Sequence, residues 1–308
     1  KVQAPLALYV VDRDPKSLES SKKICMTGVK NQDQGMHRVW FLEDFAKLPK
    51  DLDICIIATT ADVRFSIAAS LLESRSIRYM IFEKVVFQRS SDFPVVGKLL
   101  EGQSVGAWVN CPMRLIPPYT HSPKGFDPKD PVAMTVTGVN WGLASNSIHF
   151  LDYFRFLTGR GLLQVESSFG QPVPIAKRGQ FFEFFGTVVG FNDRDDTLEM
   201  CCRQDLQQPD KKFEIEIKNG RSFHKRFTFR PDQIDSHDLF ESKVSSTDIS
   251  ETYQSNITNI IVEEILKTGS CRLPRFEISA LDHILLINNF LEQNSDHPAF
   301  KNETCPIT

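Results

Sequence analysis

Residues 53–84 read DICIIATTADVRFSIAASLLESRSIRYMIFEK. Residues 54–58 form a continuous apolar run, which is expected of a parallel strand buried on both faces, and residues 79–82 repeat this pattern. Between the two runs, residues 62–74 have the spacing of an amphipathic helix that packs on a sheet. The order of strand, helix and strand predicts one unit of a parallel sheet with its covering helix.

Polar residues follow both predicted strands at the point where each strand ends. Thr59 and Thr60 follow the first strand, and Glu83 and Lys84 follow the second. Because ligands of open α/β sheets bind beyond the carboxyl ends of the strands, these residues are candidates for a functional site. Lys84 also has a simpler interpretation, since a lysine after a strand is most often a solvated loop charge.

The overall composition is that of an ordinary globular protein. The chain has 308 residues, of which 41% are hydrophobic and 24% charged, with a net charge of −3. This length favours two domains, and the charge balance gives no electrostatic bias toward nucleic acid or anionic membranes. No apolar run approaches the roughly 20 residues that span a bilayer, and a secretory signal is not recognisable. We therefore expect a cytoplasmic protein with a small-molecule partner, no nucleic-acid partner and no membrane partner.

The seven cysteines are scattered along the chain, and their spacing matches neither a metal knuckle nor a redox motif. We interpret them as reduced thiols and predict no metal site.

The alternation of strands and helices continues on both sides of residues 53–84 and stops near Cys111. A proline-rich passage follows, and the later segments have the composition of antiparallel strands. The predicted strands are residues 132–139, 162–168, 183–191, 197–203, 213–218 and 223–229, and the predicted helices are residues 145–157, 251–267 and 278–292. We therefore predict an α/β domain with a doubly wound parallel sheet at residues 1–111 and an α+β domain, an antiparallel sheet covered by helices, at residues 112–308.

A second candidate region is the helix in residues 140–159, NWGLASNSIHFLDYFRFLTG, for which Gly159 is a suitable C-cap. Asn146, His149 and Asp152 are three residues apart, so they form one oblique polar stripe beside an apolar stripe. Two interpretations are open. His149 and Asp152 either form a structural hydrogen-bonded pair or belong to a catalytic group.

If the second domain closes over the carboxyl edge of the sheet, an ammonium, an imidazole and a carboxylate meet in one cleft. An alcohol that is oxidised by hydride transfer must lose its O–H proton, and His149 is the candidate base. Lys84 would then stabilise the developing alkoxide, and Asp152 would orient the imidazole.

These motifs resemble the Gfo/Idh/MocA oxidoreductases, which include glucose-fructose oxidoreductase and inositol dehydrogenases. The resemblance runs from about residue 4 to residue 292. The matching pieces are a strand that ends in residues 12–15 (DRDP), the strand and helix of residues 53–74, Glu83 and Lys84, the passage with Asn110, Arg114 and Pro117, the pair His149 and Asp152, and the helix in residues 273–292.

The resemblance implies a Rossmann-type domain followed by an open-faced antiparallel sheet domain, with NAD or NADP as cofactor and a sugar, cyclitol or sugar-derived substrate. Asp12 would hold the adenosine ribose hydroxyls, which favours NAD, whereas Arg13 could accommodate the 2′-phosphate of NADP. Lys84 would lie between the nicotinamide and the substrate. By the same resemblance, Thr59, Thr60, Glu83 and Asn110 would line the dinucleotide, and Arg114 and Asn146 would bind the substrate.

Three features depart from this family pattern. The first strand and its GxGxxG turn are absent, and because the chain begins with Lys1 rather than Met, we expect the missing piece immediately upstream. The sequence leaves open whether the chain as given binds the cofactor and is active. Val85 replaces the proline of the family's Glu-Lys-Pro motif, and Ser145 stands where many members have an aspartate four residues before the histidine.

Two functional hypotheses follow. The first is an NAD(P)-dependent oxidoreductase that transfers a hydride to or from a hydroxyl carbon of a sugar, cyclitol or nucleotide-linked sugar. The alternative is a non-catalytic protein of the same fold that acts as a ligand sensor or interaction protein, which Val85 and Ser145 favour. We expect a homo-oligomer formed through the C-terminal sheet. The phenylalanines of residues 182–185 belong either to that interface or to the core.

Overall fold

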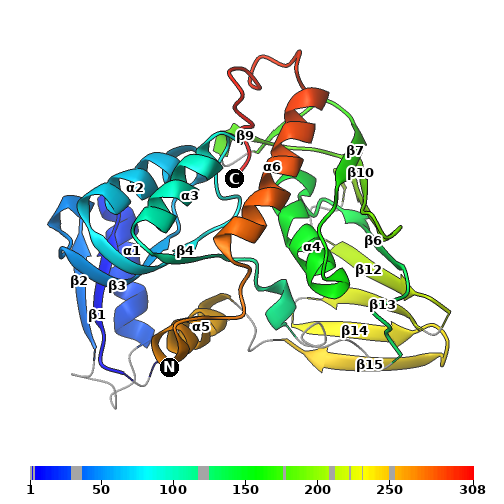
Figure 1. The fold of residues 1–308 in the computed structure, drawn as a ribbon, viewed down its shortest axis with the longest axis horizontal. Coiled ribbons are helices and arrows are strands. Elements are labelled where there is room, and N and C mark those ends of the chain that lie inside the picture. The colour runs from blue at the N-terminus through cyan, green and yellow to red at the C-terminus, as the bar shows by residue number, and fades with distance from the viewer. Residues whose placement is uncertain are drawn as a thin grey trace.

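The computed structural model describes residue 2 and residues 4–28, 37–116, 125–175, 178–207, 212–221, 223–230, 232–249 and 254–308. Lys1 and Pro117 lie outside these residues. The first half of the chain contains parallel strands with helices between them (Figure 1). These elements are β1 (Ala7–Val11), α1 (Pro15–Gly28), β2 (Arg38–Leu42), β3 (Asp51–Ile57), α2 (Ala61–Ser74), β4 (Ser76–Phe82), α3 (Asp92–Gly102) and β5 (Gly106–Val109).

The parallel strands form two sheets, where we predicted one. β1 pairs with β2, and β3, β4 and β5 form a separate three-stranded sheet in that order. No described strand pairs with both β1 and β3, so the two sheets are not joined by hydrogen bonds. The Rossmann-type character is confirmed, since every pairing in this half is parallel and helices connect successive strands.

The second half is built on an eight-stranded sheet with the order β15-β14-β13-β12-β6-β11-β10-β7. Its strands are β6 (Val132–Val139), β7 (Gln164–Phe169), β10 (Gly186–Phe191), β11 (Thr197–Arg203), β12 (Lys212–Asn219), β13 (Phe223–Arg230), β14 (Gln233–Asp238) and β15 (Lys243–Asp248). The pair β6–β11 is parallel and the other pairs are antiparallel, so the sheet is mixed and not purely antiparallel. A further ladder joins β8 (Val173–Ile175) and β9 (Arg178–Glu183).

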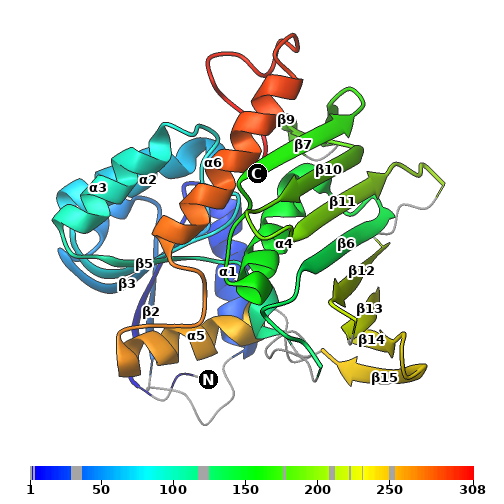
Figure 2. The same ribbon diagram turned by 45° about the vertical axis from the view of Figure 1, so that its right-hand side comes forward.

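Helices α4 (Leu143–Thr158) and α6 (Phe276–Gln293) pack against this sheet and against each other. α6 also contacts β5 and α3, so it lies between the two halves, as Figure 2 shows. Helix α5 (Gln254–Thr268) does not cover the large sheet as predicted. Its isoleucines pack on Ile81 and Trp108 of β4 and β5, because that face of the parallel sheet is apolar. The division at residues 111 and 112 stays a prediction.

The phenylalanines of residues 182–185 belong to the core, which confirms one of the two interpretations above. Phe184 is fully buried, and Phe182 and Phe185 pack against the main hydrophobic cluster. This cluster contains residues from both halves, so one continuous core joins them. Among the described residues, no helix combines the length and the apolar character that a bilayer span requires.

Candidate active site

Lys84 connects the two halves of the protein. It follows β4 at the carboxyl end of the strand, and its Nζ donates hydrogen bonds to the backbone oxygen of Ser145 at 3.0 Å and to Oδ1 of Asn146 at 3.3 Å. Both acceptors belong to the first turn of α4. The Lys84–Val85 peptide bond is cis, although valine replaces the proline of the family motif. Lys84 is thus half-buried between the two halves, and the interpretation as a solvated loop charge is wrong.

A buried arginine that we did not predict holds the backbone around Lys84. The guanidinium of Arg64 in α2 donates to the carbonyl oxygens of Thr59, Val85 and Val86, and the Arg64 residue is only 1% exposed. Burial lowers its pKa to about 10, and the charge of Glu83 acts against this shift. One side chain therefore holds the loops after β3 and β4 together.

The sequence contains a signal for Arg64 that we did not use. The buried face of α2 consists of Ala61, Arg64, Ala68, Leu71 and Leu72, so an arginine occupies a position with core spacing. Charged residues in a core stripe need partners, and this one finds them in backbone carbonyls.

The residues expected to line the dinucleotide meet at the carboxyl edge of the three-stranded sheet. The carboxylate of Glu83 accepts hydrogen bonds from Nδ2 of Asn110 at 2.8 Å and from the backbone N–H of Lys84 at 3.2 Å. The side-chain oxygen of Asn110 is buried and has no hydrogen-bond partner among the described residues. Thr59 and Thr60 follow β3 at the same edge, where Thr59 is exposed and Thr60 half-buried.

Asp12 and Arg13 lie apart from this group on the separate two-stranded sheet. Both residues are exposed after the end of β1, and Oδ1 of Asp12 accepts a hydrogen bond from the backbone N–H of Asp14 at 2.9 Å. The position beyond a parallel strand is the one predicted, but no side-chain contact joins these two residues to Glu83 or Lys84 within the described part of the chain.

Helix α4 is held firmly at both ends. Gly142 precedes it with φ +83°, and a Cβ there would lie 2.8 Å from the hydroxyl of Ser145. The carboxylate of Glu183 in β9 accepts hydrogen bonds from the N–H groups of Ala144 at 2.8 Å and Ser145 at 3.3 Å, which satisfies the first amides of the helix. The helix ends at Gly159 with φ +70°, as predicted.

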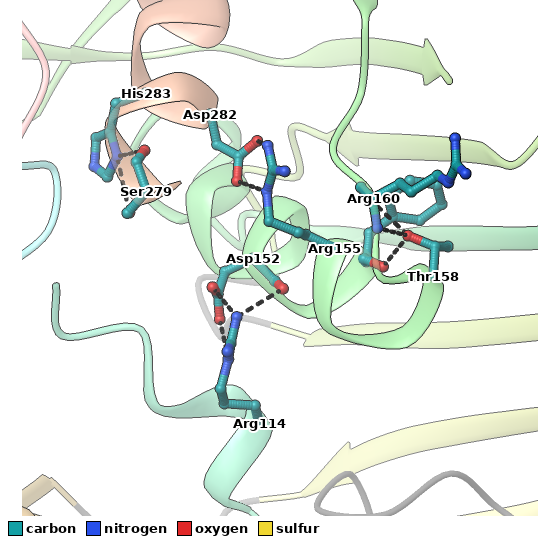
Figure 3. A network of polar contacts seen from close by, with 9 residues as sticks. Arg114, Asp152, Arg155, Thr158, Arg160, Ser279, Asp282 and His283 are labelled. Carbon is teal, nitrogen blue, oxygen red and sulfur yellow. Dashed lines mark hydrogen bonds and ion pairs between the residues drawn. The ribbon is translucent and has the colours of Figure 1, made fainter. Parts of the chain in front are cut away.

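Asp152 is not the partner that we expected for His149. Its carboxylate forms a bidentate ion pair with Arg114, in which Nε donates to Oδ2 at 2.9 Å, and a second pair joins Arg155 and Asp282 nearby (Figure 3). A carboxylate that is 1% exposed needs a charged partner, and a neutral imidazole cannot supply one. Burial raises the pKa of Asp152 to about 6, while the charge of Arg114 acts against this shift. Arg114 is therefore engaged by Asp152, where we expected it to face a substrate.

His149 lies on the same helix, and its ring has no hydrogen-bond partner within the described part of the chain. Burial, together with smaller contributions from Lys84 and His283, lowers the pKa of His149 to about 3. The ring is therefore neutral near pH 7, and the effect of Lys84 places the two groups in one electrostatic environment. Asn146, three residues earlier, accepts from Lys84 and donates to the carbonyl oxygen of Trp141 at 2.6 Å.

A cavity of about 180 Å³ lies beside His149 and Asn146. Its other lining residues are Met113 from the turn η3 (Pro112–Leu115), Trp141 before α4, Phe150 in α4 and Phe213 in β12. Sequence reasoning missed this apolar wall, because its members come from segments that are far apart in the chain. The site thus combines an ammonium, a neutral imidazole and a small cavity, which suits proton transfer from a bound hydroxyl.

A scan against protein-family models gives no match, and a search of curated proteins gives none either. Solved structures do match the fold. One is an oxidoreductase from Agrobacterium radiobacter in complex with NAD⁺, L-tartaric acid and magnesium, with a TM-score of 0.62 and 15% identity, covering 91% of this chain and 86% of that one.

Two further structures extend this comparison. Levoglucosan dehydrogenase in complex with NADH and L-sorbose has a TM-score of 0.66 and 12% identity, covering 92% of this chain and 87% of that one. The transcriptional regulator Gal80p from Kluyveromyces lactis has a TM-score of 0.62 and 15% identity, covering 94% of this chain and 82% of that one. The chain therefore has the fold of the Gfo/Idh/MocA oxidoreductases.

Proposed function

We propose that this protein is an NAD(P)-dependent oxidoreductase that transfers a hydride to or from a hydroxyl carbon of a sugar, cyclitol or nucleotide-linked sugar. The observation that carries this proposal is the hydrogen bonding of Lys84 to the first turn of α4, with His149 one turn further along that helix. An amine at the carboxyl end of a parallel strand and an imidazole from the other half then face one cleft.

The residues at the carboxyl edge fit a dinucleotide. Thr59 and Thr60 offer hydroxyls, Glu83 a carboxylate and Asn110 a buried side-chain oxygen that no described residue engages, and such groups suit ribose hydroxyls and a carboxamide. When bound, the cofactor supplies the acceptor or donor of the hydride. Structural neighbours solved with NAD⁺ and with NADH support this assignment.

The chain's own residues divide the proton chemistry between them. In the direction of oxidation, the neutral ring of His149 accepts the proton of the substrate hydroxyl, and the ammonium of Lys84 stabilises the negative charge that develops on that oxygen. Asn146 and the carbonyl oxygen of Ser145 hold Lys84 in place. Because burial and the charge of Lys84 lower the pKa of His149, the base stays unprotonated well below pH 6.5.

The experiment combines cofactor binding with turnover. The protein should bind NADH or NADPH in a fluorescence titration and reduce NAD⁺ or NADP⁺ with at least one member of a panel of sugars and inositols. Lys84→Ala should lower turnover by roughly 100-fold or more while the Kd for the cofactor stays within about tenfold. Lys98→Ala, at an exposed lysine of α3, is the matched control and should leave both quantities unchanged. Equal turnover in Lys84→Ala and the wild type would remove Lys84 from the mechanism.

A second candidate function is a ligand sensor. Asp152 is engaged by Arg114, and no carboxylate in the described residues orients the ring of His149, so the proton relay is reduced. The similarity in fold to a transcriptional regulator supports this alternative. Ligand-dependent binding of a partner protein, without turnover of any sugar, would favour it over the oxidoreductase.

A further inference from the structure

We infer that the substrate is a deoxy sugar whose methyl-bearing flank enters the cavity beside His149. This inference rests on the proposed function, because it takes a carbohydrate-type alcohol as the ligand. The evidence is the composition of the cavity lining, in which Asn146 and His149 are the polar members and the remaining side chains are aromatic or aliphatic.

The apolar wall consists of Met113, Trp141, Phe150 and Phe213. The rings of Trp141 and Phe150 are 5.2 Å apart between centroids at 89°, and those of Phe150 and Phe213 are 5.5 Å apart at 75°. Edge-to-face packing of this kind holds the wall in a fixed shape. The indole N–H of Trp141 donates to the carbonyl oxygen of Cys201 at 2.9 Å, so it is not available to a sugar hydroxyl.

The polar part of the lining consists of Asn146 and His149. The carboxamide of Asn146 binds Lys84 and the carbonyl oxygen of Trp141, whereas the imidazole of His149 has no hydrogen-bond partner among the described residues and is the group that receives the reacting hydroxyl. Arg114 and Asp152 form an ion pair with one another, and neither residue lines the cavity. A hydroxyl on the far side of the sugar ring would therefore face the aromatic wall and lose its hydrogen bonds to water.

The size of the cavity fits one flank of a sugar. Its volume of about 180 Å³ is below the roughly 300–1,000 Å³ of pockets that enclose drug-sized ligands. An apolar pocket of this kind favours a methyl group over a hydroxylated group at the same position by roughly 10- to 100-fold, since the polar group finds no partner inside it.

The test compares pairs of sugars that differ in one hydroxyl. Dissociation constants are measured by ligand-observed NMR for L-fucose and L-galactose, L-rhamnose and L-mannose, and 6-deoxy-D-glucose and D-glucose, in the presence of NADH or NADPH. The comparison uses the pair that contains the tightest-binding of the six sugars. In that pair, we expect the dissociation constant of the deoxy sugar to be at least 10-fold lower than that of its hydroxylated partner. Equal affinities, tighter binding of the hydroxylated sugar, or no binding of any of the six sugars would overturn the inference.

Two variants test whether the apolar wall causes the preference for the deoxy sugar. Phe213→Tyr and Met113→Gln each place a polar group in the wall, and each should reduce the ratio of the two dissociation constants at least threefold. Phe191→Tyr, at a phenylalanine of β10 that is 41% exposed, is the control and should keep the wild-type ratio. An unchanged ratio in both wall variants, with the fold intact by circular dichroism, would overturn the inference. A retained preference for the deoxy sugar without any turnover would instead contradict only the proposed function.

Discussion

Arginines support both sides of the contact between Lys84 and α4, but they bind different partners. On the loop after β4, Arg64 donates to three backbone carbonyls, and the side chain of Lys84 reaches across to the first turn of α4. On α4, the buried partners are carboxylates, since Arg114 binds Asp152 and the helix's own Arg155 binds Asp282 of α6.

This difference shows which side chains remain available for chemistry. An arginine that binds carbonyls fixes the backbone and leaves the neighbouring side chains to the site. An arginine that binds a carboxylate engages that side chain itself, which is why Asp152 supports α4 and does not orient His149. Under the proposed function, the loop after β4 contributes Lys84, whereas α4 contributes His149 and the Asn146 side chain that binds Lys84.

The largest effect should come from the ion pair that supports α4. Arg114→Met leaves Asp152, which is 1% exposed, without its charged partner, so we expect the free energy of unfolding to fall by about 3–5 kcal/mol. Arg160→Met is the matched control, because its pair with Asp193 is about half-exposed and should cost less than about 1 kcal/mol. Urea unfolding measures both variants. Equal losses would show that the pair does not hold α4.

Acid should weaken the same region through His283 of α6. Burial lowers the pKa of this ring to about 4, and the charges of Arg64 and Lys84 contribute. The unfolded ring takes up its proton near pH 6.5, so the contribution of His283 to stability is complete above that pH and is lost as the pH falls toward 4. The loss is roughly 3 kcal/mol across this window.

His283→Gln tests this dependence, because glutamine does not titrate. The free energy of unfolding, measured at intervals from pH 7 to pH 4.5, should fall less steeply in the variant than in the wild type. Parallel curves for the two proteins would mean that another group carries the acid sensitivity.

A smaller effect is expected on the other side of the contact between Lys84 and α4. Arg64→Met removes the donor for the carbonyls of Thr59, Val85 and Val86, and we expect a loss of about 2 kcal/mol in the free energy of unfolding. Arg78→Met in β4 is the control, since its pair with Asp53 is mostly exposed.

Arg64→Met should also lower turnover, because Lys84 loses its fixed backbone. If turnover and stability were both unchanged in this variant, Arg64 would not be the residue that positions the loop.

Much of the fold follows from local patterns in the sequence. The apolar runs and helical spacing of residues 53–84 predicted β3, α2 and β4, and strand composition predicted most strands of the large sheet. β14 and β15 were not predicted, since their sequences, QIDSHD and KVSSTD, are polar and carry little strand signal. The packing of α5 depends on which apolar face is left open elsewhere, and its own sequence does not contain that information.

The site shows the same limit. The spacing of Asn146, His149 and Asp152 correctly identified residues on one side of α4, but spacing within a helix does not reveal partners from other elements. Arg114 is 38 positions away from Asp152, and Lys84 is 62 positions away from Asn146. The hydrogen bond between Lys84 and Asn146 was not predicted, because we expected Asn146 to bind the substrate. The contact with Arg114 decided the role of Asp152.

The most direct test of a shared cleft is the pKa of His149 with and without the charge of Lys84. An NMR titration of ¹³C-labelled histidine can follow this ring in the wild type and in Lys84→Met, and His149→Gln assigns its signal. We expect a pKa well below 6.5 in the wild type, because burial and Lys84 both lower it, and a clear rise toward 6.5 in Lys84→Met. An ordinary pKa near 6.5 that is the same in both proteins would contradict the pairing of Lys84 with His149.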